Sequence, residues 1–489
     1  MNFGIVRKLI GKIMVLIGVF MILPILVCLF YQERFWNYMS FAIPSLSMIL
    51  IGLLMSIKKA NPKMQAKEGL VIVSLSWLII SLFGAVPLIL SGYYPSYFDA
   101  LFEITSGFTT TGASVTSAEL MAELNNTGHS ILFWRSFSHW IGGMGILVFI
   151  LGIIPESDEG SSIQILRAES PGPQVGRLTS RMKASSRILY LIYIALTSLE
   201  IFLLIIGPNH EMSFFDTLIY AFGTAGTGGF ANNPLSVEIY SPYYQYVIGT
   251  FMFMFGVNFS LYYLILIRRT KEVFKNEELI TYLIIAFTAI IIICVNIYPK
   301  CESFGETFRL AYFQTASIIS TTGFSTTNFN DWPTLAKSVL VLLMVFGACA
   351  GSTAGGLKIS RVVIIIKSSF AKVRGMVNPR KVQVIKVNGE VVSPETVSNA
   401  LSYTLIYVIV MVVGGVLISF DGFDMTTNFS ASLACISNIG PGLSVVGPYG
   451  SYADFSGFSK IILAIEMIAG RLELFPILIL FSRNTWKKM

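Results

Sequence analysis

The sequence contains few charged residues. Only 12% of its 489 residues are Asp, Glu, Lys or Arg, whereas 54% are hydrophobic, and the mean hydropathy is +0.71. A soluble domain carries about 25% charged residues. The composition therefore excludes a water-soluble fold and predicts an all-α integral membrane protein.

Metal-binding and catalytic side chains are also scarce. The chain has three His, and its five Cys are scattered without the spacing of a metal site or a disulfide framework. No nucleophile–base pair and no phosphate-binding loop is present, which excludes an enzyme. The basic residues are divided among several separate segments, which argues against nucleic-acid binding.

Ten apolar segments are long enough to cross a bilayer, which takes about 20 residues. The first of them follows a basic start and resembles a signal peptide, but it is too long and no cleavage site follows, so we interpret it as an uncleaved span. The ten segments lie near residues 11–31, 38–57, 69–91, 130–154, 187–207, 243–267, 279–298, 335–366, 396–419 and 457–482.

Basic residues give the expected orientation. With the N-terminus inside, the cytoplasmic segments hold 27 of the 34 Lys and Arg residues, as the positive-inside rule requires. Both termini are then cytoplasmic. Topology alone explains these charges, and a docking face for a cytosolic partner is an additional interpretation. The cytoplasmic segments are 1–12, 58–67, 155–187, 268–278, 358–394 and 483–489.

Four shorter apolar pieces lie between the spans, and each ends in a small polar turn that contains Gly. They cover residues 98–108, 213–223, 307–319 and 425–436, which is too short to cross and suits re-entrant helices. The glycines of the turns that align best are Gly112, Gly228, Gly323 and Gly440, which are 116, 95 and 117 residues apart.

This recurrence predicts four units of span, half-helix, polar turn and span. Copies with the same orientation can form a pseudo-symmetric ring around one axis along the membrane normal. We expect two extra transmembrane helices in 1–66, the first pore unit in 67–160, the second in 161–272, the third with a gating loop in 273–375, and the fourth in 376–489.

The turns have the chemistry of a cation filter. Gly tolerates backbone angles that let successive carbonyls point inward, and rings of carbonyls can replace the hydration shell of a cation. No carboxylate lies in any turn, which favours a monovalent ion. Thr/Gly turns that only cap or pack buried helices are the alternative. The predicted ion-binding residues are Thr111, Gly112, Thr227, Gly228, Thr322, Gly323, Ile439 and Gly440, flanked by Thr110, Gly226, Thr321 and Asn438.

The eighth span contains a glycine-rich interruption, "FGACAGSTAGGLKIS". Gly costs about 1 kcal/mol against Ala inside a helix, so we predict a broken helix whose middle is a flexible gating loop below the turns. A small-residue packing face is the alternative, because Gly351 and Gly355 form a GxxxG motif. The other predicted gating residues in this segment are Gly347, Ser352, Thr353 and Gly356.

Some ionisable residues interrupt apolar sequence. Arg471 lies in "AGRLELF", and we expect it to project into the ion pathway near the gating loop, or else to pair with Glu466 or Glu473. We expect Arg135 to extend to the outer membrane interface. Three Asp residues begin half-helices and are expected to cap them, namely Asp99, Asp216 and Asp424.

The motifs together resemble the Trk/Ktr/HKT superfamily of cation transporters, over nearly the whole chain. The resemblance rests on "TTTGAS", "GTGGF", "STTGFSTTNF", "SNIGPGLS", "HWIGGMGILV" and "AGRLELFPILIL". The extra N-terminal pair of spans is similar to the bacterial TrkH branch. Glycine at all four filter positions resembles potassium-selective members, although the second and fourth turns depart from the Thr-Thr-Gly pattern.

The resemblance implies gated potassium uptake across the cytoplasmic (inner) membrane of a bacterium, driven by the membrane potential. It also implies a homodimer, with each protomer having its own pore, and a cytosolic TrkA-like subunit that binds nucleotide and controls opening. Potassium is then the transported ion, and no covalently bound cofactor is expected. The alternatives are a proton- or sodium-coupled symporter and a non-transporting membrane sensor. The symporter is disfavoured because no Asp or Glu lies in the turns or in the broken helix.

Overall fold

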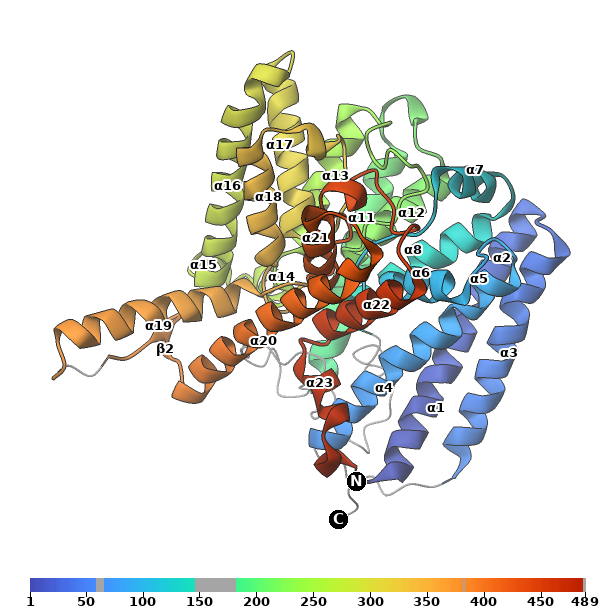
Figure 1. The fold of residues 1–489 in the computed structure, drawn as a ribbon, viewed down its shortest axis with the longest axis horizontal. Coiled ribbons are helices and arrows are strands. Elements are labelled where there is room, and N and C mark those ends of the chain that lie inside the picture. The colour runs from blue at the N-terminus through green and yellow to red at the C-terminus, as the bar shows by residue number, and fades with distance from the viewer. Residues whose placement is uncertain (59–65, 146–181, 381–382, 487–489) are drawn as a thin grey trace.

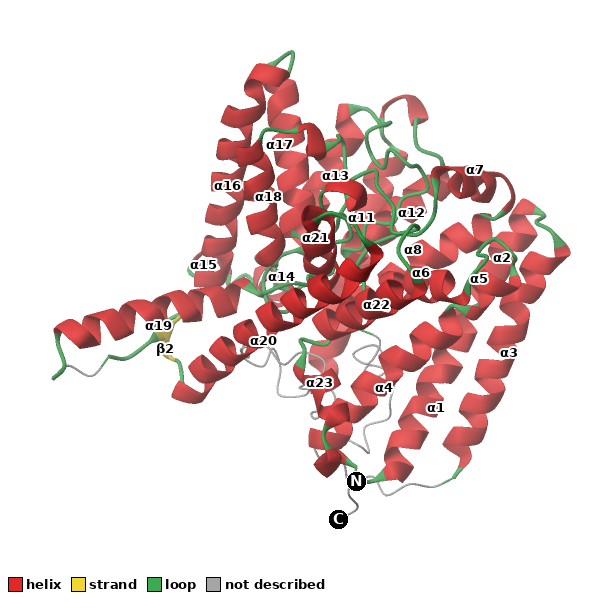
Figure 2. Cartoon of the chain, viewed as in Figure 1, coloured by secondary structure: helices red, strands yellow, loops and turns green. Residues whose placement is uncertain are grey.

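The protein was analysed as a computed structural model, which describes residues 1–58, 66–145, 182–380 and 383–486. Nearly all regular structure in this part is helical (Figures 1 and 2). The only strands there are β1 (Lys386–Val387) and β2 (Glu390–Val391), which pair antiparallel in a small hairpin.

The N-terminal region consists of α1 (Phe3–Phe20), α2 (Ile22–Tyr31) and α3 (Phe35–Ile57). Helices α1 and α3 lie side by side (Figure 1). Their backbones approach closely where Gly11 faces Gly52, since a Cβ on Gly11 would lie 2.6 Å from the Gly52 carbonyl oxygen. Small residues permit this approach, as in other pairs of membrane helices.

The remaining helices follow in sequence order. The next group is α4 (Ala66–Gly84), α5 (Val86–Leu90), α6 (Tyr97–Phe108), α7 (Ala118–Thr127) and α8 (His129–Gly143). It is followed by α11 (Met182–Ile205), α12 (Phe214–Gly226), α13 (Pro242–Phe255), α14 (Phe259–Leu266) and α15 (Thr270–Phe274). Then come α16 (Glu277–Ile297), α17 (Phe304–Ile319), α18 (Thr334–Val345) and α19 (Ile359–Val377). The last are α20 (Pro394–Ile418), α21 (Met425–Ile436), α22 (Gly457–Arg471) and α23 (Phe475–Leu478).

Short 3-10 helices join several of these elements. They are η2 (Pro208–His210), η3 (Tyr298–Lys300), η4 (Phe329–Asp331), η5 (Ser419–Asp421), η6 (Ser444–Val446), η7 (Ile479–Phe481) and η8 (Arg483–Thr485).

Within the described residues, six helical segments are long and apolar enough to cross a membrane, and the α13–α14 pair, which bends by 93°, makes a seventh when it is counted as one span. The predicted spans 243–267 and 457–482 are not continuous helices, and the span 335–366 is broken as the sequence predicted. The breaks occur at Gly256–Asn258, at 346–358 and after Arg471. The predicted span 130–154 is described only as far as residue 145, where α8 has already ended.

The four predicted re-entrant pieces are all short helices, namely α6, α12, α17 and α21. Their N-caps are Ser96, Ser213, Ser303 and Asp424, whose side chains accept from backbone N–H groups of the first turn. The prediction that Asp99 and Asp216 are caps was wrong. Asp99 instead pairs with Lys460 at 2.6 Å, and Asp216 is the third helical residue of a capping box.

The four short helices are linked in a closed circle of contacts. Helix α8 packs against α12, α13 against α17, α18 against α21, and α22 returns to α6. Each short helix is thus held by the helix that follows the preceding short helix in the circle. This arrangement brings the ends of four segments far apart in sequence to one place.

Candidate ion pathway

The four turns after the short helices share one backbone conformation. Each contains a residue in the left-handed region, with φ between +55° and +57°, and a glycine two positions later with φ between +78° and +93°. Only Gly adopts such angles without strain. The first residues are Thr110, Thr227, Thr321 and Asn438, and the glycines are Gly112, Gly229, Gly323 and Gly440.

This conformation corrects the sequence alignment of the second turn by one residue. The residue between the two left-handed positions donates its N–H to a helix carbonyl at 2.8–2.9 Å in all four turns, and in the second turn that residue is Gly228. Gly226, predicted as a flank, is the last residue of α12. The missed residue is Gly229. The spacings of the glycines become 117, 94 and 117 residues, so spacing alone does not distinguish Gly229 from Gly228.

The four turns contact one another in cyclic order. A Cβ built on Gly112 would lie 1.9 Å from the carbonyl oxygen of Gly228, and one on Gly229 would lie 2.0 Å from that of Thr322. A Cβ on Gly323 would lie 2.1 Å from the carbonyl oxygen of Ile439. The fourth turn closes the circle, because a Cβ on Gly440 would lie 2.6 Å from the carbonyl oxygen of Thr111. Glycine is required at each contact, since no side chain fits there.

One cavity of about 140 Å³ is lined by all four turns. It is bordered by Gly112, Gly229, Gly323 and Gly440, one glycine from each turn in the corrected alignment, together with the segments that follow the turns. The structure therefore brings the predicted turn residues together around a common space.

The first left-handed residue of each turn, just after the short helix, carries a side-chain oxygen. The Oγ1 of Thr110 and the Oδ1 of Asn438 are buried and have no hydrogen-bond partner in the described part of the chain. The Oγ1 of Thr321 accepts from the N–H of Gly355 at 2.8 Å, and the Thr227 hydroxyl donates to the Gly226 carbonyl at 2.6 Å. The oxygens of Thr110 and Asn438 are thus the two of these four without a hydrogen bond within the described residues.

The predicted break in the eighth span is confirmed. Helix α18 ends at Val345, α19 begins at Ile359, and the loop between them closes on itself through a bridge from Phe346 to Leu357. A Cβ on Gly355 would lie 2.4 Å from the Ser437 carbonyl oxygen, so the loop lies directly against the third and fourth turns. Its other predicted residues are Gly347, Gly351, Ser352, Thr353 and Gly356.

The loop is fixed from two sides. The Glu278 carboxylate at the start of α16 accepts from the N–H groups of Ala350 at 2.7 Å and Ser360 at 3.1 Å. The Cys349 N–H donates to the carbonyl of Gly256, which lies at the bend between α13 and α14, at 3.1 Å. The two broken helices therefore meet, and sequence patterns gave no signal for the role of Glu278.

Arg471 joins the loop to the first unit. Its guanidinium donates to the carbonyl of Thr353 at 2.6 Å and to the carbonyls of Gly142 and Gly143 at 2.5 and 2.6 Å. The acidic candidates have other partners: Glu473 pairs with Arg361, and Glu466 accepts from Ser432 at 2.8 Å. Arg471 therefore lies beside the loop, as predicted, and bridges two segments.

Arg135 does not extend to the membrane interface, so that prediction was wrong. Its side chain is 2% exposed and forms an ion pair with the fully buried Glu103 of α6 at 2.5 Å. A charge buried at this depth needs such a partner. The sequence gave no signal for the pair, because its members lie 32 residues apart on different helices.

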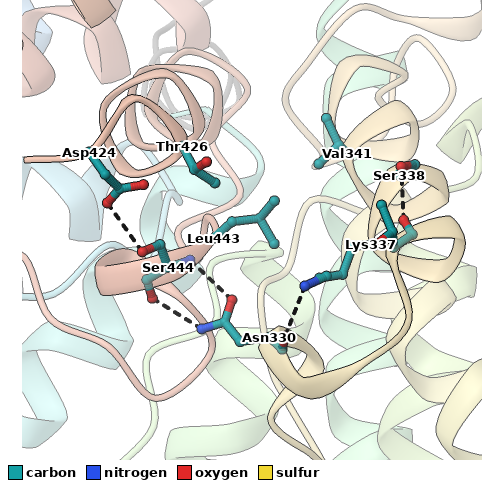
Figure 3. Close-up of a pocket in the computed structure, with 9 residues that line it drawn as sticks. Asn330, Lys337, Ser338, Val341, Asp424, Thr426, Leu443 and Ser444 are labelled. Carbon is teal, nitrogen blue, oxygen red and sulfur yellow. Dashed lines mark hydrogen bonds between the residues drawn. The ribbon is translucent and has the colours of Figure 1, made fainter.

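The segments after the third and fourth turns are joined beside a second, open pocket of about 560 Å³ between α18 and α21 (Figure 3). Asn330 donates to the Ser444 carbonyl and accepts from the Ser444 N–H, both at 3.0 Å. Lys337 donates to the Asn330 carbonyl at 3.1 Å. On the opposite wall, hydrogen bonds from Thr427 and Ser444 hold the pKa of Asp424 below its usual range.

Comparison with known proteins identifies the relatives of this arrangement. The model of the TrkH family, described as a cation transport protein, matches residues 38–488. The chain belongs to this family. It is 31% identical over 501 residues to the Trk system potassium uptake protein TrkH of Salmonella typhimurium, and 30% identical over 500 residues to that of Escherichia coli. Each alignment covers 100% of both chains.

A solved structure has the same fold. The crystal structure of the potassium transporter TrkH from Vibrio parahaemolyticus matches with a TM-score of 0.87 and 29% identity, and the match covers 100% of both chains. Family membership and the long apolar helices make this chain a multi-pass membrane transport protein and not an enzyme. It carries the TrkH fold.

Proposed function

We propose that the chain is a potassium-selective, gated uptake pore of a bacterial cytoplasmic membrane. Four pseudo-symmetric units surround one pore, and the first two long helical segments, 3–31 and 35–57, lie outside this ring. The observation that carries the proposal is the single cavity bordered by Gly112, Gly229, Gly323 and Gly440. The potassium uptake proteins to which the chain is similar support the choice of ion.

The filter holds the ion by backbone carbonyls. The ion-binding residues are those of the four turns in the corrected alignment, with Gly228 and Gly229 in place of Thr227 and Gly228. Because no carboxylate lies in the turns, the ligands are dipoles, which suit a monovalent cation. The unpartnered oxygens of Thr110 and Asn438 add ligands at the inner end.

The 346–358 loop is the gate. It lies against Thr321 and Ser437 at the inner end of the turns and is bridged to the first unit by Arg471. In this position the loop obstructs the inner exit of the filter, and the guanidinium repels a cation there. Opening requires the loop to leave these contacts.

A cytosolic nucleotide-binding subunit controls the gate, and the protein acts as a homodimer with both termini in the cytoplasm. The support is the membership of related proteins in Trk systems and helix α19, which extends sideways from the helical body (Figure 1) and carries the exposed basic residues Lys372 and Arg374. The N-terminal end of α19 is continuous with the loop, so a movement of α19 reaches the gate directly.

The proposal is tested by ion flux into liposomes that contain the purified protein. Potassium, sodium and the pH gradient are varied separately, and the membrane potential is set independently. A pore gives flux that follows the potential, which supplies about 2.3 kcal/mol per charge per 100 mV. Flux that is absent under a potential alone contradicts the proposal.

A proton-coupled symporter is the second candidate, and one observation favours it. Glu200 of α11 is fully buried and forms no ion pair within the described residues, which is the setting of a group that carries a proton. If flux requires a pH gradient, Glu200→Gln should abolish that requirement. Flux independent of pH eliminates this candidate.

A further inference from the structure

His139 of α8 connects the first two turns of the proposed filter. Its ring is fully buried. The Nδ1 lies 2.7 Å from the carbonyl oxygen of Gly107, in the last turn of α6, and the Nε2 lies 3.2 Å from the backbone nitrogen of Phe230. Phe230 directly follows Gly229. The His139 side chain therefore contacts α6, which precedes the first turn, and Phe230, which follows the second turn.

The two hydrogen bonds determine the state of the ring. A backbone N–H can only donate and a carbonyl can only accept. Nε2 must therefore accept from Phe230 and Nδ1 must donate to Gly107, so the imidazole is neutral and carries its proton on Nδ1. The ring also fills the space beside Gly228, where a Cβ would lie 2.3 Å from its atoms.

Arg135, one helical turn earlier on α8, supports the same region. Its guanidinium lies 4.3 Å from the centre of the Phe230 ring and donates to Ser114 at 3.1 Å. Its partner Glu103 accepts from the N–H of Val115 at 2.8 Å. Residues four apart lie on one helix face. Arg135 and His139 thus contact the segments that follow the first and second turns, at Ser114 and Phe230.

We infer that His139, supported by Arg135, is a positioning residue that fixes the spacing of the first two turns and thereby the preference for potassium over sodium. The inference rests on the proposed filter. Selectivity by carbonyls depends on where those carbonyls are held, and Gly228, whose carbonyl approaches Gly112, lies two residues before Phe230. Within the described residues, the Phe230 N–H donates to the Nε2 of His139 and to no other side chain.

The test uses two substitutions of His139 that keep different halves of the imidazole. The amide of His139→Gln can present an oxygen near the position of Nε2 and accept from Phe230, whereas the shorter amide of His139→Asn can donate only to Gly107. Both remove the ring. His129→Asn is the matched control, because His129 begins the same helix and stacks on Tyr31 outside the turns.

The readout is the ratio of potassium to sodium flux in liposomes containing the full-length protein. One backbone hydrogen bond contributes about 1 kcal/mol, so His139→Asn should lower the ratio about fivefold. His139→Gln and His129→Asn should keep the ratio within about twofold of the original. A role in packing alone would change both His139 variants equally, and that result overturns the inference.

Arg135→Lys provides a second test if neither His139 variant reaches the membrane. It keeps the charge opposite Glu103 but loses the planar group above Phe230, so the ratio should fall in the same direction, and an unchanged ratio overturns the inference. Gly323→Ser separates this result from failure of the filter proposal. If Gly323→Ser changes the ratio and the His139 and Arg135 variants do not, only the inference fails.

Discussion

Replacing Gly323 by Ser is the most direct test of the four-turn arrangement. Gly323 has φ +89°, and a Cβ there would lie 2.1 Å from the Ile439 carbonyl oxygen and 2.8 Å from the Cδ of Pro441. Ordinary contacts begin at 3.4 Å, so the overlap with the carbonyl is about 1.3 Å. The protein can relieve it only by moving the fourth turn away from the third.

Two effects have to be separated in this variant. The positive φ itself costs about 1–2 kcal/mol for a residue with a side chain. The overlap of the new Cβ with the Ile439 carbonyl also displaces that carbonyl, which is a proposed ion ligand. Gly422→Ser controls for the first effect, because Gly422 has φ +79° and a Cβ there would meet nothing within 4 Å.

The assay is the ratio of potassium to sodium flux in liposomes, measured at equal amounts of inserted protein. Gly323→Ser should lower the ratio about tenfold, equivalent to about 1.4 kcal/mol, because the displaced carbonyl no longer fits the preferred ion. Gly422→Ser should leave the ratio unchanged. A Gly323→Ser protein that transports with the original ratio would refute the idea that these carbonyls select the ion.

Three further predictions concern the gate and the buried ion pair. Arg471→Gln should raise basal flux because the loop loses its hydrogen bonds to the first unit, and deletion of residues within 347–356 should raise it because less of the loop obstructs the pathway. Protein that inserts into the membrane but transports no ion would argue against a gate. Glu278→Ala removes the acceptor for the N–H groups of Ala350 in the loop and Ser360 at the start of α19, and it should also raise basal flux, measured against Glu277→Ala. Glu103→Gln should lower the free energy of unfolding by about 3–5 kcal/mol, because Arg135 is left buried without its charge partner. Glu103→Met combined with Arg135→Leu should recover much of that loss in a thermal unfolding assay, and no recovery would contradict the explanation.

The sequence was sufficient to predict the class of the protein and the position of its four turns. Apolar length, the placement of basic residues and the repeated short segments are local properties, and they depend on the bilayer more than on the neighbouring helices. The break at 346–358 was also predictable, because several glycines in a span weaken any helix.

Sequence patterns gave wrong predictions for residues whose position depends on contacts with segments remote in the chain. Gly228 and Gly229 are chemically identical, and only the backbone conformation of the turn and the contact of Gly229 with the Thr322 carbonyl show that Gly229 corresponds to Gly323. Arg135 was expected at the interface because its partner Glu103 is remote in sequence.

The sequence by itself determined that this chain lies in a membrane and repeats one helical unit with a glycine-bearing turn, since composition and periodicity act over a few residues. Only the tertiary structure decided how the turns meet, that His139 links the first to the second, and that the loop lies against the third and fourth. These contacts join residues that are far apart along the chain. Their geometry follows from packing in three dimensions, which no pattern in one segment contains.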